Sequence, residues 1–325
     1  MRVASFSLAV VLCAVCSGCA LVLADLDPFG RTPEGLRETV LEGKGDDKIV
    51  LLDVSNVITA DEQEGALGLS RRESTVSRVT QVLQRASEDD DVKALVLRIN
   101  SPGGTVGASD IIYHEVRSYA EKKRVPVVAQ FLDLGTSGAY YVALASDEIV
   151  AQPTSVTGSI GVILFGLNLE GLLDKIGVRD DTLKAGENKD LGSPLRTRRP
   201  EEQAILQGVL DTMHGRFIEL VRERRPAVRS EEIAKVTDGR IFTADQALQL
   251  GLVDRIGYLD DAIAAAKQRA GLREAQIVVY HRPSELSENI YSRSIAAPQV
   301  NLVNFETGAL FSGEAQFMYL WRPGI

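Results

Sequence analysis

Three short segments of the chain place glycine beside side chains that could do covalent chemistry. Ser101-Pro102-Gly103-Gly104 follows an apolar run, and paired glycines there let backbone N–H groups approach a ligand, as an oxyanion cradle requires. In Gly135-Thr136-Ser137-Gly138, the serine hydroxyl lies at a predicted helix start, beside amides that lack intrahelical partners. The third segment, residues 184–194, carries two lysines in a Gly-rich loop. Taken singly, each segment is also typical of a plain turn, a helix cap or a solvated charge.

Histidine, the usual partner of a catalytic serine, is scarce in this chain. A Ser-His-Asp hydrolase needs an imidazole that a carboxylate orients beside the serine. The chain has three histidines, and none of them follows a Gly-rich loop: His114, His214 and His281. If Ser137 is a nucleophile, lysine is the remaining candidate for its base, because burial can lower the pKa of an amine until it accepts a proton.

Composition excludes several classes of function. The 325 residues are 45% hydrophobic and 25% charged, which suits a sizeable core and argues against general disorder. The formal net charge of -9 lacks the basic excess of a nucleic-acid-binding domain. With three histidines and three cysteines, the chain has few ligands for zinc and no disulfide framework. We therefore expect no metal, no cofactor and no nucleic-acid partner.

The N-terminal segment predicts attachment to a membrane. Residues 3–24 carry no charge, follow a single arginine and are numerous enough to cross a bilayer, as in an export signal. Cys16-Ser17-Gly18-Cys19 is similar to a bacterial lipobox, in which Cys19 would become the lipidated N-terminus. The alternative is an uncleaved signal anchor; we favour lipidation because two small residues directly precede Cys19. Both interpretations place the protein at the cell membrane, on the exported side of a bacterial membrane.

Beyond the N-terminal segment, apolar runs alternate with segments of helical spacing. Strands are expected at residues 49–54, 94–99, 126–132 and 148–151, and helices at 75–87, 108–122, 137–145 and 200–225. Such alternation predicts an α/β fold, with a mostly parallel sheet flanked by helices. We expect an export signal over 1–24, a linker over 25–47, one domain over 48–280 and a C-terminal extension over 281–325.

The order of the motifs resembles that of the signal peptide peptidase A family, membrane-attached serine peptidases with a Ser/Lys dyad. The resemblance covers about Lys48 to Gly257. After the Ser-Pro-Gly-Gly and Thr-Ser-Gly motifs, it rests on Thr157-Gly158-Ser159-Ile160-Gly161-Val162, Lys189-Asp190 with Ser193-Pro194, and Gly239-Arg240-Ile241-Phe242-Thr243-Ala244.

This resemblance implies a crotonase-like fold shared with the Clp protease proteolytic subunit, and a role for each matching residue. Ser137 corresponds to the nucleophile, Lys189 to the general base and Ser159 to the hydroxyl that holds the lysine amine. The oxyanion-hole amides correspond to those of Gly103 and Gly138. Lys184 is a rival base, but the residues after Lys189 fit the family pattern. The half-length members that the chain resembles assemble into homo-oligomeric rings.

The function expected from the sequence is a membrane-attached serine endopeptidase that hydrolyses peptides, remnant signal peptides in particular. Two alternatives stay open. One is acyl-CoA chemistry of the crotonase type, which also uses a Gly-rich oxyanion hole. The other is a non-catalytic membrane scaffold on the same fold, although every dyad position is filled. For the aromatic tail Phe317-Met318-Tyr319-Leu320-Trp321, we favour docking onto the domain or a neighbouring subunit over entry into an active-site groove.

Overall fold

The computed structural model describes residues 35–64, 71–283, 285–286, 289–292, 295–296 and 316–321. The expected export signal and Cys19 lie outside the described residues. The chain divides into two units, 1–35 and 36–325, and the second is described here. Within the described ranges, no helix has both the length and the apolar character needed to span a bilayer.

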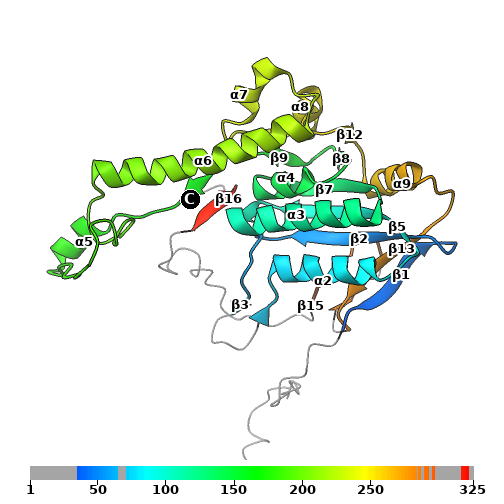
Figure 1. Cartoon of the computed structure of the whole chain (residues 1–325), viewed down its shortest axis with the longest axis horizontal. Helices are drawn as coiled ribbons and strands as arrows, with labels where there is room; N and C mark the ends of the chain where they lie inside the picture. The colour runs from blue at the N-terminus through cyan, green and yellow to red at the C-terminus, as the bar shows by residue number, and fades with distance from the viewer. Residues whose placement is uncertain are drawn as a thin grey trace, which may run out of the picture. The chain divides into compact units, whose positions relative to one another are not determined.

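A nine-stranded sheet forms the centre of this unit (Figure 1). Its main path runs β1-β13-β2-β5-β7-β8-β12; β9 pairs with β7, and β11 with β9. The strands are β1 (Arg37–Gly43), β2 (Lys48–Ser55), β5 (Val92–Ser101), β7 (Val127–Thr136), β8 (Glu148–Ala151), β9 (Val156–Gly158), β11 (Ile241–Thr243), β12 (Arg255–Ile256) and β13 (Gln276–His281). Only the β1/β13 and β11/β9 pairs are antiparallel. The expected α/β fold with a mostly parallel sheet is confirmed.

Helices cover both faces of the sheet because its central strands are apolar on both sides. Alternate residues of β2 and β5 pack in two separate cores, as a period of two requires. One core includes α2 (Thr75–Ser87), α3 (Val106–Lys123) and α4 (Gly138–Ala143); the other includes α9 (Leu259–Ala270). The remaining helices are α5 (Glu170–Lys175), α6 (Pro200–Arg224), α7 (Ile233–Val236) and α8 (Ala244–Gln249), with a short 3-10 helix at Ser230–Glu232.

One part of the expected linker is instead a strand. Residues Arg37–Gly43 form β1, which pairs antiparallel with β13 near the other end of the domain. The segment looked like a linker because its side chains are half-buried or exposed, so it lacks the apolar run of a central strand. The pairing partner, β13, is more than two hundred residues further along the chain, so the local sequence of β1 does not predict the pairing.

A second, three-stranded sheet lies where the predicted functional motifs meet. Its order is β10 (Ile163–Leu164), β16 (Phe317–Leu320) and β6 (Gly103–Thr105). The tail of the chain thus forms the middle strand of a sheet with the Ser-Pro-Gly-Gly turn. Two two-stranded pairs complete the described strands: β3 (Gln63–Glu64) with β4 (Arg71–Arg72), and β14 (Glu285–Leu286) with β15 (Ile295–Ala296).

A buried ion pair joins the two central strands. Arg98 of β5 and Asp53 of β2 are register partners, and the Arg98 Nε and Nη2 donate to the two Asp53 carboxylate oxygens at 2.5 and 2.8 Å. Only 1% of the Arg98 side chain is exposed. Its guanidinium also donates to the carbonyls of Ile290 and Ser292, which ties a distant segment to the sheet. Asp53 therefore neutralises a charge that cannot reach water.

We predict that Asp53→Ala lowers the free energy of unfolding by about 3 kcal/mol, because it leaves a buried arginine without its counter-ion. Urea denaturation of the purified protein measures the change. Asp46→Ala is the matched control, since Asp46 is exposed in the turn after β1 and forms no ion pair in the described part of the chain. Equal effects of the two substitutions would contradict a structural role for the Arg98–Asp53 pair.

Candidate active site

Ser137 occupies a strained turn between β7 and α4. Its φ is +52° and its ψ is -117°, a conformation that side-chain-bearing residues rarely adopt. Two backbone hydrogen bonds hold it there: Ser137 N–H donates to Gly158 O at 2.7 Å, and Tyr141 N–H donates to Ser137 O at 2.9 Å. The Ser137 hydroxyl makes no capping hydrogen bond to α4. Ser137 therefore holds the N-cap position of α4, but its side chain does not cap the helix.

Ser159 lies beside Ser137 because neighbouring parallel strands end together. Thr136, at the end of β7, pairs with Gly158 at the end of β9, and each strand is followed by a serine. Ser159 also has a φ of +52°, and its amide donates to Arg240 O at 2.7 Å. The structure thus brings together two of the predicted site residues from segments more than twenty positions apart.

The Ser-Pro-Gly-Gly turn packs against the start of α4. A Cβ built on Gly103, whose φ is +100°, would lie 2.7 Å from Gly138 N, so only glycine allows this approach. Gly138 is the first residue of α4, and its amide has no intrahelical acceptor. The Gly103 amide donates to Ser101 Oγ at 3.1 Å. The next amide in the turn is that of Gly104. Gly104 belongs to the Ser-Pro-Gly-Gly motif, but the family resemblance assigned the oxyanion-hole amides to Gly103 and Gly138 alone.

Lys189 is not part of this cluster within one chain. It is exposed, on the loop between α5 and α6, and its only hydrogen bond in the described residues is from its backbone N–H to Gly186 O. Figure 1 shows that loop and α5 at the N-terminal end of α6, away from α4. The structure therefore assembles Ser137, Ser159, Gly103 and Gly138, and leaves the predicted base apart from them.

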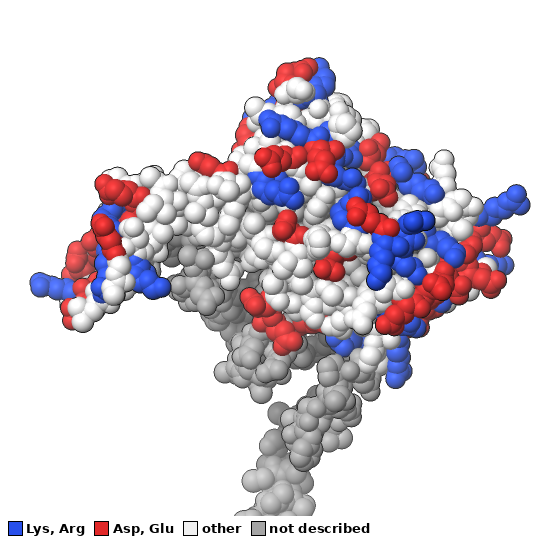
Figure 2. Space-filling model, in the orientation of Figure 1, with Lys and Arg blue, Asp and Glu red and all other residues white. Residues whose placement is uncertain are grey.

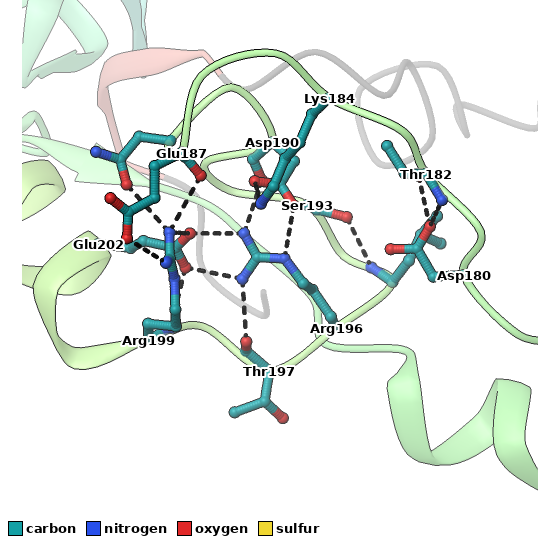
Figure 3. Close-up of polar contacts among 12 residues, drawn as sticks. Asp180, Thr182, Lys184, Glu187, Asp190, Ser193, Arg196, Thr197, Arg199 and Glu202 are labelled. Carbon is teal, nitrogen blue, oxygen red and sulfur yellow. Dashed lines mark hydrogen bonds and ion pairs between the residues drawn. The ribbon is translucent and has the colours of Figure 1, made fainter.

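An ion-pair network fixes the loop that carries Lys189 (Figure 3). Asp190 accepts hydrogen bonds from Arg196 Nε at 2.8 Å and from Lys184 Nζ at 2.6 Å. Glu202, whose side chain is fully buried, accepts from Arg196 Nη2 at 2.6 Å and Arg199 Nη2 at 2.8 Å. These contacts hold the pKa of the Asp190 and Glu202 carboxyls well below their ordinary values. For both carboxyls, the hydrogen bond from Arg196 is the largest cause. The adjacent residue, Lys189, is left outside the network.

The network also decides between the two candidate lysines. The Lys184 amine is held by the Asp190 carboxylate of its own loop, at 2.6 Å, so it does not point free of the loop. The amine of Lys189 has no such partner among the described residues. Lys189 is therefore the better placed of the two to act as a base toward a group outside its own loop.

The histidines are engaged elsewhere. His214 Nε2 lies 2.7 Å from Thr237 O, and His281 Nε2 lies 2.8 Å from Thr39 Oγ1. His114 lies on α3, with Nε2 3.4 Å from Ser118 Oγ. None of these hydrogen bonds involves Ser137 or Ser159, which agrees with a site that has no imidazole base.

Comparisons with known proteins show what the chain is similar to. The family model for Peptidase family S49 matches residues 119–273. A relative from Enterococcus faecium, named as a signal peptide peptidase, SppA, is 38% identical over 252 residues, which are 78% of this chain and 72% of the relative. A relative from Synechocystis sp., named as a protease, is 42% identical over 211 residues, 65% of this chain and 73% of the relative. Among solved structures, a ClpP1 mutant from Listeria monocytogenes is 18% identical with a TM-score of 0.41, covering 66% of this chain and 94% of that one.

We predict that Gly104→Ala destabilises the turn that faces Ser137, by about 1 to 3 kcal/mol in the free energy of unfolding. A Cβ at this position would lie 1.9 Å from Ile58 O, a backbone atom that cannot swing away. Gly107→Ala, two residues into α3, is the control because nothing lies within 4 Å of its Cβ. Thermal unfolding compares the two; a Gly104→Ala protein as stable as Gly107→Ala would show that the turn can relax.

We also predict that Glu202→Gln loosens the Lys189 loop without unfolding the domain. The substitution weakens charge-assisted hydrogen bonds to two arginines, so amide hydrogen exchange across residues 184–199 should accelerate at least about tenfold. Exchange in the central strands should not change. The neighbouring Glu201, which is exposed, supplies the control Glu201→Gln. Unchanged exchange in the loop after Glu202→Gln would mean that other contacts order it.

Proposed function

The chain belongs to the signal peptide peptidase A family, peptidase family S49, and on that premise we propose that it is a membrane-attached serine endopeptidase with Ser137 as nucleophile and Lys189 as general base. The conformation and surroundings of Ser137 are the main support for this proposal. A structural serine at a helix start bonds to its own helix. This one is 1% exposed, is held at positive φ and leaves its hydroxyl unbonded to the helix, beside the Gly138 amide. Strain of this kind is typical of residues kept in place for chemistry.

We assign the steps of the proposed reaction to these residues as follows. Ser137 Oγ gives its proton to the uncharged Lys189 amine and attacks the carbonyl carbon of a peptide bond. The oxyanion accepts hydrogen bonds from the Gly138 amide and from an amide of the Gly103-Gly104 turn; one such donor typically contributes about 100- to 1000-fold in rate. Lys189 then returns the proton to the leaving amine. Water, deprotonated by Lys189 in the same way, hydrolyses the acyl-enzyme, and the Ser159 hydroxyl holds the lysine amine between steps.

We propose that the dyad forms between subunits. Ser137 is buried in the domain, whereas Lys189 is exposed on a loop at the far end of α6. A head-to-tail contact that repeats around a ring brings the loop of one subunit to the Ser137 of the next, and closes without a free end. The ring expected from the sequence then has a catalytic purpose, because a single subunit has an incomplete site.

The surface of the loop region supports such a contact. α5 has no buried residue, and a helix that buries nothing gains no stability from tertiary packing. Large apolar side chains are exposed throughout this region: Ile163, Phe165, Leu167, Leu172, Ile176, Val178, Leu183, Leu195, Ile205 and Val209. Figure 2 shows few charged side chains on the part of α6 nearer α5. Exposed apolar surface of this extent is typical of an interface, and we assign it to a second copy of the chain.

Remnant signal peptides are the substrates we propose, held in or at the membrane. The supporting arguments are the family membership and the uncharged N-terminal segment, which would attach the enzyme on the exported side of a bacterial membrane through Cys19 or as an uncleaved anchor. Acyl-CoA chemistry of the crotonase type is the competing function. It needs no Ser137/Lys189 pair, so acylation of Ser137 by a serine-directed reagent would separate the two. A scaffold without activity would also fail to react.

We predict that Ser137→Ala and Lys189→Ala each abolish peptide hydrolysis, by at least about 1000-fold, because the two residues act as a unit. Co-expression of the two variants should restore about a quarter of the wild-type rate, since a head-to-tail site can take an intact serine from one subunit and an intact lysine from its neighbour. Hydrolysis of a denatured protein by the assembled chain is the measurement.

Lys175→Ala is the matched control, because Lys175 is an exposed lysine on α5, in the same region. It should keep wild-type activity. A mixture that remains inactive, with both single variants inactive, would place the dyad within one chain. Full activity of either single variant would remove the Ser/Lys assignment itself.

A further inference from the structure

Strand β7 contains a bulge shortly before it ends at the candidate active site. Ile99 of β5 pairs with Phe131, but Ser101, two residues later, pairs with Gly135, which is four residues later. β7 therefore has two more residues than β5 over this stretch. The extra length lies in residues 132–134, which are less buried than the strand on either side of them. β-Bulges are frequent next to active sites, where they change the direction of a side chain.

The bulge sets how far Ser137 lies from the Ser-Pro-Gly-Gly turn. With the bulge, Gly135 is opposite Ser101, so β5 and β7 leave the sheet at the same level. Without it, Asp133 would be opposite Ser101, and Ser137 would lie two residues further on, about 7 Å at the rise of a strand residue. Because the extra residues are two in number, the alternation of side chains between the faces of the sheet is kept. The bulge therefore moves the serine along the strand without turning it to the other face.

Asn100 holds the bulge from the side of β5. The register of β5 with β7 skips this residue, which lies opposite the bulge. Its side chain makes the contacts instead: Oδ1 accepts from the Leu134 N–H at 3.2 Å, and Nδ2 donates to Asp133 Oδ2 at 3.0 Å. A carboxamide can do both because it carries an acceptor and a donor on one carbon. These two hydrogen bonds replace the strand pairing that the bulge interrupts.

Ser155 holds the bulge from the other side, where β7 changes its neighbour. β7 pairs with β8 up to Phe131 and with β9 from Leu134 onward, so the change falls on the bulge. Ser155 is 1% exposed and directly precedes β9. Its hydroxyl donates to the carbonyls of Phe131, at 3.1 Å, and of Leu132. The bulge is thus held on both sides by a buried or half-buried polar side chain from outside β7.

The bulge ends in a close contact that only glycine allows. A Cβ built on Gly135 would lie 2.3 Å from Phe131 Cδ1, so the Phe131 ring lies against the Gly135 backbone. The Gly135 carbonyl accepts from Thr157 Oγ1 at 2.7 Å, which joins this point to β9. From Gly135 the strand is buried again, and it leads through Thr136 directly to Ser137. The position of the serine is therefore determined at the bulge.

We propose that Asn100 and Ser155 are positioning residues for the nucleophile: by holding the β7 bulge, they set the distance between Ser137 and the oxyanion-hole amides. The inference rests on the proposed function, because it concerns the reaction that Ser137 would carry out. A displacement of a reacting group by about 1 Å costs on the order of 100-fold in rate. Weakening the hold on the bulge should therefore lower kcat much more than it weakens substrate binding.

Exchanging the side chains of Asn100 and Asp133 tests this role with matched variants. Asn100→Asp keeps an acceptor for the Leu134 amide, but it places a second carboxylate where the amide now donates to Asp133 at 3.0 Å. Repulsion between the two carboxylates should open the bulge. For hydrolysis of a denatured protein by the assembled chain, we expect kcat to fall about 10- to 100-fold, with KM within about threefold.

Asp133→Asn is the control, because the new side chain still offers an oxygen to Asn100 Nδ2, and its kcat should stay within about twofold of the unmodified value. The double variant Asn100→Asp/Asp133→Asn reverses donor and acceptor, so the hydrogen bond forms again. Its kcat should return to within about threefold of the control. Such a rescue is expected only if the contact between these two side chains is what matters.

Amide hydrogen exchange measures the hold on the bulge without hydrolysis. The Leu134 and Ser137 amides should exchange at least about tenfold faster in Asn100→Asp than in the unmodified chain, and the double variant should reverse the change.

Should Asn100→Asp fail to fold, Ser155→Ala tests the bulge from its other side, and its kcat should fall at least about tenfold. Ser146→Ala is the control for this variant. Ser146 is also a buried serine whose hydroxyl donates to a backbone carbonyl, that of Ala143, but it lies beyond α4 and does not contact the bulge. Its kcat should not change.

Two outcomes would overturn the inference while the proposed function stands: an Asn100→Asp enzyme that keeps its kcat, or a double variant that is as slow as Asn100→Asp. An inactive unmodified chain, or an active Ser137→Ala variant, would instead overturn the proposed function. The exchange measurement separates the two cases, because faster exchange at Ser137 that the double variant reverses would show that the bulge fixes this residue whatever its chemistry.

Discussion

The parallel pairing of β7 with β9 is the constraint on which the site depends. It sets Thr136 opposite Gly158, so the residues that follow, Ser137 and Ser159, leave the sheet side by side. The Gly158 carbonyl then accepts the Ser137 amide and locks the serine at positive φ. A slip of one residue in this register would turn each serine to the opposite face of its strand. The fold tolerates the strain at Ser137 because the last two residues of β7, Gly135 and Thr136, and all of α4 are buried.

The two residues of the proposed dyad are positioned by different kinds of interaction. Ser137 is positioned by a sheet and a packed core, which resist small displacements. Lys189 is positioned by charged side chains on a loop with little apolar burial, through Asp190, Arg196 and Glu202. Exposed ion pairs are weak singly, but Glu202 is fully buried and takes several hydrogen bonds at once. The loop can therefore keep one conformation without packing against the part of the domain that carries Ser137.

Much of this architecture could be predicted from the sequence because it is local. Apolar runs located the central strands, and the helix expected over 200–225 begins at Pro200 and ends at Arg224. Motif order located Ser137, Ser159, Gly103 and Gly138, which the fold then gathered. The pairing of β1 with β13 and the insertion of β16 could not be predicted, because each depends on a partner far along the chain. The separation of Lys189 from Ser137 was also missed: a single sequence does not distinguish contacts within a subunit from contacts between subunits.

The tail strand β16 and the Lys189 loop are ordered in different ways, the loop by its own ion pairs and the tail by strands of the domain. β16 has four residues and finds both of its hydrogen-bonding partners in strands of the domain. The exposed apolar side chains around α5 are those that we propose a second subunit covers. Under the proposed mechanism, the oxyanion hole is preformed in one subunit, and a second subunit supplies the base on assembly. On that proposal, activity would depend on the concentration of subunits, because their association completes the dyad.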